Sequence, residues 1–159
     1  MKERPGRLSR DAAARIIDVN LNRLTEGLRV VEDVVRLALE DRRLLAGIRK
    51  LRTQIGRDVR ALRKQVISSR KSETDPGRGD RFDRAKRKSL EDVLLANFKR
   101  AEESARVLEE VLKITEPGLA GKFKAVRFRL YDLERDALAA NDETPSPNTA
   151  LSDRDRRGQ

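Results

Sequence analysis

The sequence NLNRLTEGLRVVEDVV occupies residues 20–35, and a related sequence, NFKRAEESARVLEEVL, occupies residues 97–112. In both, apolar residues recur at intervals of three and four, which predicts an amphipathic helix in each stretch. The polar residues also recur at the same places. The identical polar pairs are Asn20 and Asn97, Arg23 and Arg100, Glu26 and Glu103, Arg29 and Arg106, and Glu32 and Glu109. The sequence therefore predicts two similar helices that form an internal repeat.

Periodicity and capping residues extend this repeat to two helical hairpins. Helices are expected over about residues 10–40, 41–66, 89–114 and 118–139. Ser9, Asp41 and Ser89 are suited to cap the first three helices, and Pro117 stands near the start of the fourth. We expect an all-α fold, a four-helix bundle in which the hairpins 10–66 and 89–139 are related by approximate two-fold symmetry.

The segments outside the hairpins read differently. Residues 67–88 contain Asp75-Pro76-Gly77 and form a turn-rich loop that is longer than a bundle connection needs. Residues 1–9 are expected to be a flexible N-terminus. Residues 140–159 are polar, contain proline and lack periodicity, which is typical of a disordered tail or an interdomain linker. The helical domain is thus expected to span residues 10–139.

Composition limits the possible chemistry. The chain has no cysteine and no histidine, which excludes disulfides, thiolate nucleophiles, imidazole bases and most zinc sites. Its net charge of +10 favours anionic partners. The charge alone does not distinguish nucleic acid, a membrane surface and a small phosphorylated ligand. No apolar stretch is long enough to span a membrane, and no signal peptide is visible, so we expect a cytoplasmic protein.

Several polar residues fall on helix faces that should be apolar. On a helical wheel Asn20 and Arg23 lie inside the apolar arc, Glu26 lies at its edge, and Arg52 interrupts the stripe of the second helix. A buried guanidinium needs a carboxylate or an anionic ligand. One interpretation is a structural network, with Arg23 paired to Glu26 and the two asparagines bonded across the bundle.

The other interpretation, which we favour, is an interior cleft for a phosphorylated ligand, because arginine suits phosphate. It assigns catalytic roles to Arg23, Arg100, Arg52 and Arg127, ligand binding to Asn20 and Asn97, and magnesium binding to Glu26 and Glu103. Arg29, Glu32, Arg106 and Glu109 are expected on a solvated face with ion pairs three residues apart.

The loop adds a second candidate phosphate site. Arg70, Lys71, Arg78 and Arg81 flank the Asp75-Pro76-Gly77 turn. The amides at Gly77 and the Arg78 side chain are suited to bind substrate or nucleotide phosphates, and Asp75 to bind magnesium. Such a turn is weak evidence alone, since most have no ligand. The chain has no Walker A sequence and no protein-kinase motifs.

The pattern N-x-x-R-x-x-E-x-x-R-V-x-E, the DPG loop and the sequence K-F-K-x-x-R-x-R-L-Y-x-L-E resemble the small hydroxymethylpyrimidine-phosphate kinase family. The resemblance covers roughly residues 12–136. Members of this family are often fused ahead of thiamine-phosphate synthase. The resemblance implies transfer of the ATP γ-phosphate to the pyrimidine phosphate, with magnesium, and a fused or separate synthase as partner. It supplies no catalytic residues, so the site assignments rest on the wheel.

Two other functions stay open at this stage. One is a non-enzymatic basic helical module that binds RNA or a protein partner. Nucleic acid is the less favoured ligand, because aromatic residues for base stacking are only 3% of the chain. The other is an oligomerisation domain of a fused synthase. The sequence leaves the oligomeric state open, a homo-oligomer included.

Overall fold

The structure is a computed structural model that describes residues 8–78 and 85–143. Within those residues it is all-helical, which confirms the predicted all-α class, with five α-helices where four were predicted. Its helices are α1 (Arg10–Val34), α2 (Arg42–Asp58), α3 (Arg60–Val66), α4 (Leu90–Thr115) and α5 (Pro117–Glu143). Most of the predicted N-terminus (1–9), Arg81 and most of the predicted tail (140–159) lie outside the described residues. None of the described helices is both long and apolar enough to cross a bilayer.

The predicted capping residues begin three of the helices. The Ser9 hydroxyl accepts from the amide of Ala12 at 3.1 Å, and the Asp41 carboxylate accepts from the amide of Leu44 at 2.8 Å. Ser89 accepts from the amide of Asp92 at 3.1 Å, while the Asp92 carboxylate accepts from the amide of Lys88. Each bond satisfies an amide that has no partner within its helix, so the caps fix where the helices start.

Three boundaries differ from the prediction. The second helix is interrupted at the buried residue Val59 (φ −100°, ψ 3°), which separates α2 from α3. This break lets α3 pack against α1, where Arg63 donates to the side-chain oxygen of Asn22 at 3.3 Å. The first helix ends in a π-helical turn over Val35–Leu39, followed by Glu40 in the left-handed region (φ 53°). Finally, α5 extends to Glu143, so residues 140–143 are helical rather than part of a tail.

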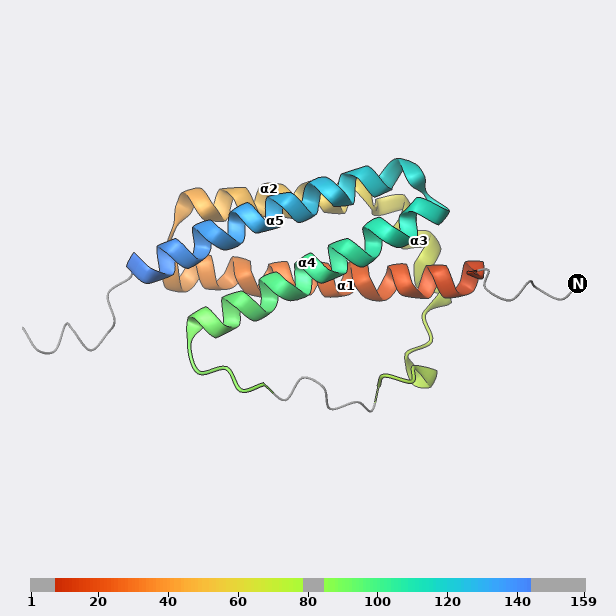
Figure 1. Cartoon of the computed structure of the whole chain (residues 1–159), viewed down its shortest axis with the longest axis horizontal. Coiled ribbons are helices and arrows are strands. Elements are labelled where there is room, and N and C mark those ends of the chain that lie inside the picture. The colour runs from red at the N-terminus through yellow and green to blue at the C-terminus, as the bar shows by residue number, and fades with distance from the viewer. Residues whose placement is uncertain (1–7, 79–84, 144–159) are drawn as a thin grey trace, which may run out of the picture.

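The helices form two layers (Figure 1). α1 and α4 run side by side in opposite directions, and α2 and α5 lie together over them. Residues 72–78 and 85–89 lie on the other side of α1 and α4, away from α2 and α5. The core between the layers is aliphatic with two phenylalanines, and its largest members include Ile17, Leu24, Leu28, Ile48, Phe98, Leu108, Phe123 and Leu130.

The crossing of α1 and α4 depends on a residue without a side chain. A Cβ atom added at Gly27 would lie 2.8 Å from the backbone oxygen of Asn97, closer than real contacts allow. The equivalent position in the second hairpin holds Ser104, which is buried. Gly27 therefore sets how closely the two long helices approach.

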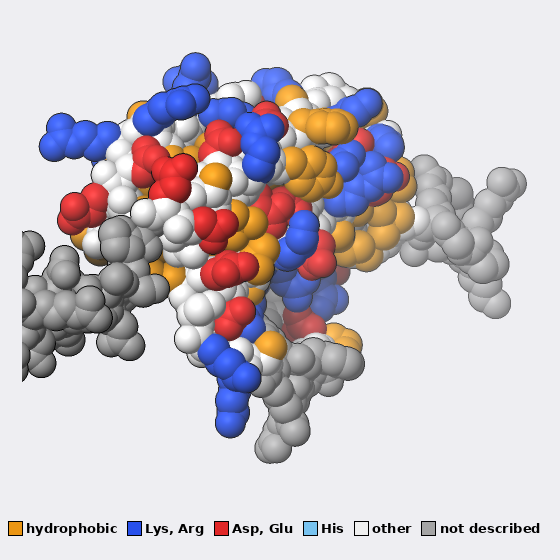
Figure 2. All heavy atoms as spheres, turned by 60° about the vertical axis from the view of Figure 1, so that its left-hand side comes forward, with side chains coloured by type: hydrophobic (Ala, Val, Ile, Leu, Met, Phe, Trp, Pro, Cys, Tyr) orange, Lys and Arg blue, Asp and Glu red, His pale blue; other side chains and the backbone are white. Residues whose placement is uncertain are grey.

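Charges of both signs cover the bundle. On the end where α1 turns towards α2, basic and acidic side chains are interspersed with hydrophobic ones (Figure 2). Most of these charges are solvated and contribute little to stability individually. A few buried carboxylates are the exception, and they organise the candidate site.

Candidate functional site

Glu32 is a buried carboxylate on α1 that gathers three arginines. Its side chain is 5% exposed, and it forms an ion pair with Arg52 of α2. The Nε atom of Arg49 lies 3.1 Å from Glu32 Oε1, and the Nη1 atom of Arg29 lies 3.9 Å from it. Burial would raise the pKa of Glu32, but hydrogen bonds from Arg52 and Arg49 outweigh it and hold the pKa below its ordinary value. Glu32 is therefore ionised and ties α2 to α1.

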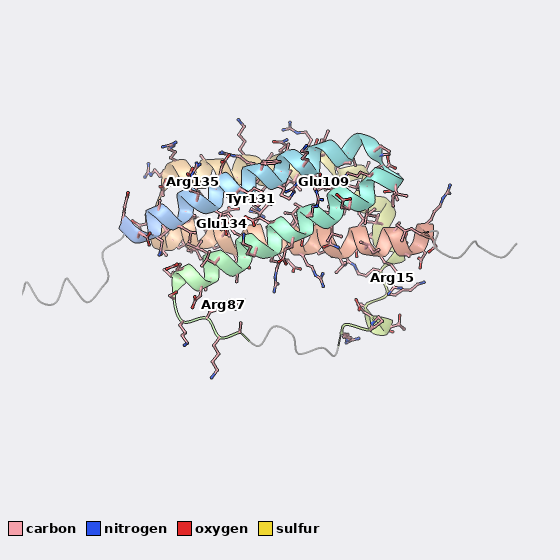
Figure 3. All side chains as sticks on the ribbon, viewed as in Figure 1. Arg15, Arg87, Glu109, Tyr131, Glu134 and Arg135 are labelled. Carbon is pink, nitrogen blue, oxygen red and sulfur yellow. The ribbon has the colours of Figure 1, made fainter. Side chains whose placement is uncertain are left out.

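Glu109 is the equivalent residue of the second hairpin. Arg127 of α5 places its Nη2 atom 3.1 Å from Glu109 Oε2, and Arg106 Nη1 lies 3.3 Å from the same oxygen. Figure 3 shows Glu109 on α4 and Tyr131 on α5. Burial opposes ionisation of Glu109, yet hydrogen bonds from Arg127 lower its pKa overall. The same kind of ion pair thus joins the helices of both hairpins.

These pairs change the expected roles of Arg52 and Arg127. The prediction of an interior cleft assumed that both guanidinium groups bind a ligand. It considered only Glu26 and Glu103 as acidic residues near them. In the structure Glu32 and Glu109 neutralise them. The prediction that these two glutamates are solvated is wrong, although their ion pairs with Arg29 and Arg106 are confirmed. A wheel for one helix could not show the arginines that a neighbouring helix brings to that face.

The prediction that Arg23 and Arg100 point into an interior cleft is also wrong, since both side chains are exposed. Asn20 is buried as predicted, but its amide donates to the carbonyl of Ile16 at 2.8 Å. Asn97 donates in the same way to Val93. The alternative in which the asparagines bond across the bundle is therefore not observed, because each amide is satisfied on its own helix. Glu26 and Glu103 are exposed as well.

The exposed motif residues nevertheless belong to one region. Because Gly27 meets Asn97 at the crossing, Arg23 lies one turn earlier on α1 and Arg100 lies one turn later on α4. The helices are antiparallel, so these two steps lead to the same level of the seam between them. We call the outer side of this crossing, at the level of Arg23 and Arg100, the α1–α4 seam. The duplicated arginines lie on the outside of the seam rather than inside the bundle.

The loop meets this seam at a hollow of about 360 Å³. Arg23 contributes from α1, and Ser72, Asp75, Gly77 and Arg78 contribute from the loop. Four residues that the sequence analysis singled out, Arg23, Asp75, Gly77 and Arg78, are thereby brought together. Within the turn, Asp75 Oδ1 accepts from the amide of Gly77 at 2.8 Å. That amide is already used, so Arg23 and Arg78 are the stronger candidates to bind an anion.

Two ion pairs hold the loop against α1. Arg70 binds Asp18 through two hydrogen bonds, of 2.7 and 2.8 Å, and Asp18 is only 4% exposed. These bonds raise the pKa of Arg70 above its ordinary value. Lys71 Nζ lies 3.1 Å from Asp11 Oδ2. Nothing in the periodicity of the first helix predicts the role of Asp18, because the arginine that covers it lies 52 positions later in the sequence.

The described residues contain no group of three or more acidic, histidine or cysteine side chains that would hold a metal ion by themselves. Glu26, Glu103 and Asp75 are exposed carboxylates. Magnesium is commonly bound by one or two carboxylates together with phosphate oxygens of a substrate. Glu26, Glu103 and Asp75 are of the ligand type that such an ion uses, and among the described residues they form no preformed metal centre.

Comparison with known proteins gives a consistent result. A model of the ThiD2 family matches residues 15–136. The thiamine-phosphate synthase of Synechococcus sp. is 41% identical over 142 residues, which cover 88% of this chain and 40% of that protein. The thiamine-phosphate synthase of Thermosynechococcus vestitus is 40% identical over 128 residues, covering 80% of this chain and 35% of that protein.

A third relative, the thiamine-phosphate synthase of Gloeobacter violaceus, is 40% identical over 128 residues, covering 80% of this chain and 37% of its own length. The chain thus spans at most about two fifths of these relatives. No solved structure matches it. The family match covers nearly all of the helical region, including both copies of the repeated motif and the loop between them. This chain belongs to the ThiD2 family.

Proposed function

We propose that this protein is a kinase of thiamine biosynthesis that transfers the γ-phosphate of ATP to hydroxymethylpyrimidine phosphate and forms the diphosphate. The observation that carries the proposal is the hollow where Arg23 meets Asp75, Gly77 and Arg78. The names of the relatives support a place in thiamine synthesis. Those names denote a synthase, but more than half of each relative lies outside the matched region, which leaves room for a separate activity in this part.

The chemistry needs positive charge more than it needs a base. Both substrates carry phosphate and repel each other, so phosphoryl transfer depends on positioning and on neutralising charge. In the proposal Arg23, Arg78 and Arg100 supply that charge at the α1–α4 seam. The acceptor is a phosphate monoester that is already ionised at neutral pH, so the absence of histidine is no obstacle. Arg52 and Arg127 are positioning residues in this proposal. Their ion pairs with Glu32 and Glu109 hold the helices in place, so they do not contact the phosphates.

Magnesium and the pyrimidine complete the assignment. Asp75, Glu26 and Glu103 would hold the magnesium ion, which would neutralise and bridge the nucleotide phosphates. Asn20 and Asn97 bond to their own helices through their amide nitrogens, so in the proposal their side-chain oxygens face the ligand. We further propose that the two hairpins are related by a two-fold axis, with the nucleotide on one side of the seam and the pyrimidine on the other.

The test is ADP release from Mg-ATP in the presence of hydroxymethylpyrimidine phosphate. Substituting Arg23→Leu or Arg78→Leu should lower kcat/KM by about a hundredfold or more, while helicity stays unchanged. The matched control is Arg36→Leu, which removes an exposed arginine that pairs with Asp33 at 3.2 Å, outside the proposed site. Equal turnover in Arg23→Leu, Arg78→Leu and the wild type would refute the assignment. A protein whose melting temperature rises with RNA and not with Mg-ATP would favour the binding module.

A further inference from the structure

The α2–α3 segment is the most basic part of the chain. Residues 42–66 contain nine basic residues and one acidic residue, a net charge of +8. Residues 117–141, which align with them when Arg127 is matched to Arg52, have a net charge of +2. Like charges three and four residues apart destabilise a helix. The first hairpin therefore carries an excess of positive charge that the second hairpin lacks.

Part of that charge borders a hollow of about 490 Å³ between α2 and α5. Lys50, Thr53, Gln54 and Arg57 occupy positions i, i+3, i+4 and i+7 on α2, so they form one stripe along the helix. Lys122 of α5 faces them, and Asp58 lies at the end of the stripe. The volume falls in the range that small-molecule sites occupy.

Charge in this hollow is not balanced by the protein. Lys122 Nζ lies 2.7 Å from Asp58 Oδ1, which neutralises both groups and links α5 to α2. Within residues 8–78 and 85–143, neither Lys50 nor Arg57 has an acidic partner at ion-pair distance. They stand seven residues apart, roughly 10 Å along the helix axis, with the hydroxyl of Thr53 and the amide of Gln54 between them. The arrangement offers two cations and two neutral hydrogen-bond donors to one ligand.

We propose that this α2–α5 hollow binds a phosphorylated small molecule, separately from the α1–α4 seam. Two cations that flank hydroxyl and amide donors suit a phosphate group, whose several oxygens accept charge-assisted hydrogen bonds. A nucleic acid fits less well, because no aromatic side chain lines the hollow for base stacking. The two hollows share no residue, and the one near the seam is lined by α1 and the loop. The proposal therefore stands whether or not the seam catalyses phosphoryl transfer.

The experiment is a titration of the full chain with inorganic pyrophosphate. Isothermal calorimetry measures the affinity, and amide chemical shifts show which residues the ligand affects. The double variant Lys50→Ala/Arg57→Ala should bind at least about tenfold more weakly. The matched control is Arg42→Ala/Arg43→Ala, which removes the same charge from exposed positions of the same helix outside the hollow. It should change affinity less than about twofold at physiological salt. Circular dichroism melts check that both variants fold.

Three results would overturn the proposal. Equal weakening in the two double variants would show only a general attraction of anions to a basic helix. Unchanged binding in Lys50→Ala/Arg57→Ala would exclude the hollow. Loss of pyrophosphate binding in Arg23→Leu, with no shift of amides in α2, would place the ligand at the seam. Binding that survives Arg23→Leu and fails in Lys50→Ala/Arg57→Ala supports the α2–α5 hollow.

Discussion

Glu32 and Glu109 occupy equivalent places in the two hairpins, and each is about 5% exposed, yet their surroundings differ. Glu32 is approached by three arginines, two of which, Arg29 and Arg49, are half-exposed. Glu109 is approached by two, and Arg127 also donates to the hydroxyl of Tyr131 at 3.1 Å. The Arg127 guanidinium lies 5.3 Å from the ring centre of Phe128 and 5.8 Å from that of Tyr131.

The two hairpins therefore share the same buried ion pair, but different groups surround its arginine. In the first hairpin the remaining positive charge faces solvent, where it can attract anions. In the second hairpin an edge-to-face aromatic pair, with ring centres 5.9 Å apart, covers the arginine. The positions equivalent to Phe128 and Tyr131 in the first hairpin are Thr53 and Gly56. The buried glutamate is thus structural in both halves, and what lies around the arginine distinguishes them.

The largest expected effect comes from removing the two carboxylates. Glu32→Gln should lower the free energy of unfolding by about 2–3 kcal/mol, because it leaves the half-buried Arg52 without its counter-charge. Glu109→Gln should cost less, since Arg127 keeps the Tyr131 hydroxyl and both rings. Urea denaturation at pH 7 measures both. Glu26→Gln and Glu103→Gln change the two exposed glutamates of the same repeat. They serve as controls and should change stability by less than about 0.5 kcal/mol.

The same variants have a defined pH dependence. The pKa of Glu32 in the folded protein is lowered, so its contribution is fully present above the ordinary pKa of 4.5 and is lost as the pH falls through the folded pKa. Wild type and Glu32→Gln should therefore converge in stability in acid. A stability difference that stays constant down to pH 3 would contradict the ion-pair explanation and point to packing.

The next largest effect on stability is expected at the crossing of α1 and α4. There the first hairpin has Gly27 and the second has Ser104. Gly27→Ala should destabilise the protein by about 1–3 kcal/mol, because the new Cβ atom would meet the Asn97 carbonyl and push α1 and α4 apart. The control is Gly56→Ala, where a Cβ atom meets nothing within 4 Å. That change should stabilise α2 by about 0.5–1 kcal/mol. Thermal melts of the two variants should shift in opposite directions.

A smaller effect concerns Glu102, which is 5% exposed and occupies the position that Thr25 holds in the first hairpin. Burial raises the pKa of Glu102, and the neighbouring Glu134 carboxyl adds to the rise, while Lys99, at 2.8 Å, opposes it. The folded protein therefore holds this proton more tightly than the unfolded chain, and stability falls as the pH rises from 4.5 towards the folded pKa. Glu102→Gln mimics the protonated form.

The stabilisation of Glu102→Gln over the wild type should accordingly be larger at pH 8 than at pH 5. Melting temperatures at the two pH values measure it. Thr25→Val is the control at the equivalent position, because the Thr25 hydroxyl bonds only to backbone oxygens of its own helix and does not titrate. If Glu102→Gln gained nothing at pH 8, folding would not raise the pKa of this carboxyl.

The smallest effect is expected at the aromatic pair. Phe128→Thr gives the second hairpin the residue that the first hairpin has at Thr53. Phe128 is 53% exposed. Stability should fall by about 0.5–1 kcal/mol, from the lost ring contact and the weaker cation–π contact with Arg127. Chemical denaturation checks this value. In the Glu109→Gln background the cost should grow, because the rings then provide more of the remaining contact to Arg127.

Much of this fold follows from local rules. Spacing of apolar residues placed the helices, and Ser9, Asp41 and Ser89 marked their starts, because caps and periodicity are properties of short stretches. The break at Val59 could not be predicted in the same way. Leu62 and Val66 continue the stripe of α2, and only the packing of α3 against α1 decides that the helix is interrupted there.

The candidate site was predicted less well, for a physical reason. A wheel gives the direction of a side chain from its own helix and not what stands in that direction. Arg23 shares an arc with buried Leu24 and Leu28, yet it emerges on the open side of the α1–α4 crossing. Glu32 shares a face with exposed Arg29, yet Arg52 covers it from α2. The loop residues Asp75, Gly77 and Arg78 were identified from turn chemistry alone, and they do meet Arg23.

Tyr131 is the chain's one tyrosine, and there is no tryptophan. Its hydroxyl accepts a hydrogen bond from Arg127, so its emission is coupled to the second hairpin and not to the first. Intrinsic fluorescence therefore follows the α4–α5 half, while circular dichroism follows every helix. If the two optical signals separate during denaturation, the repeated halves unfold one after the other. If they coincide, the Gly27 crossing makes the duplicated protein a single cooperative unit.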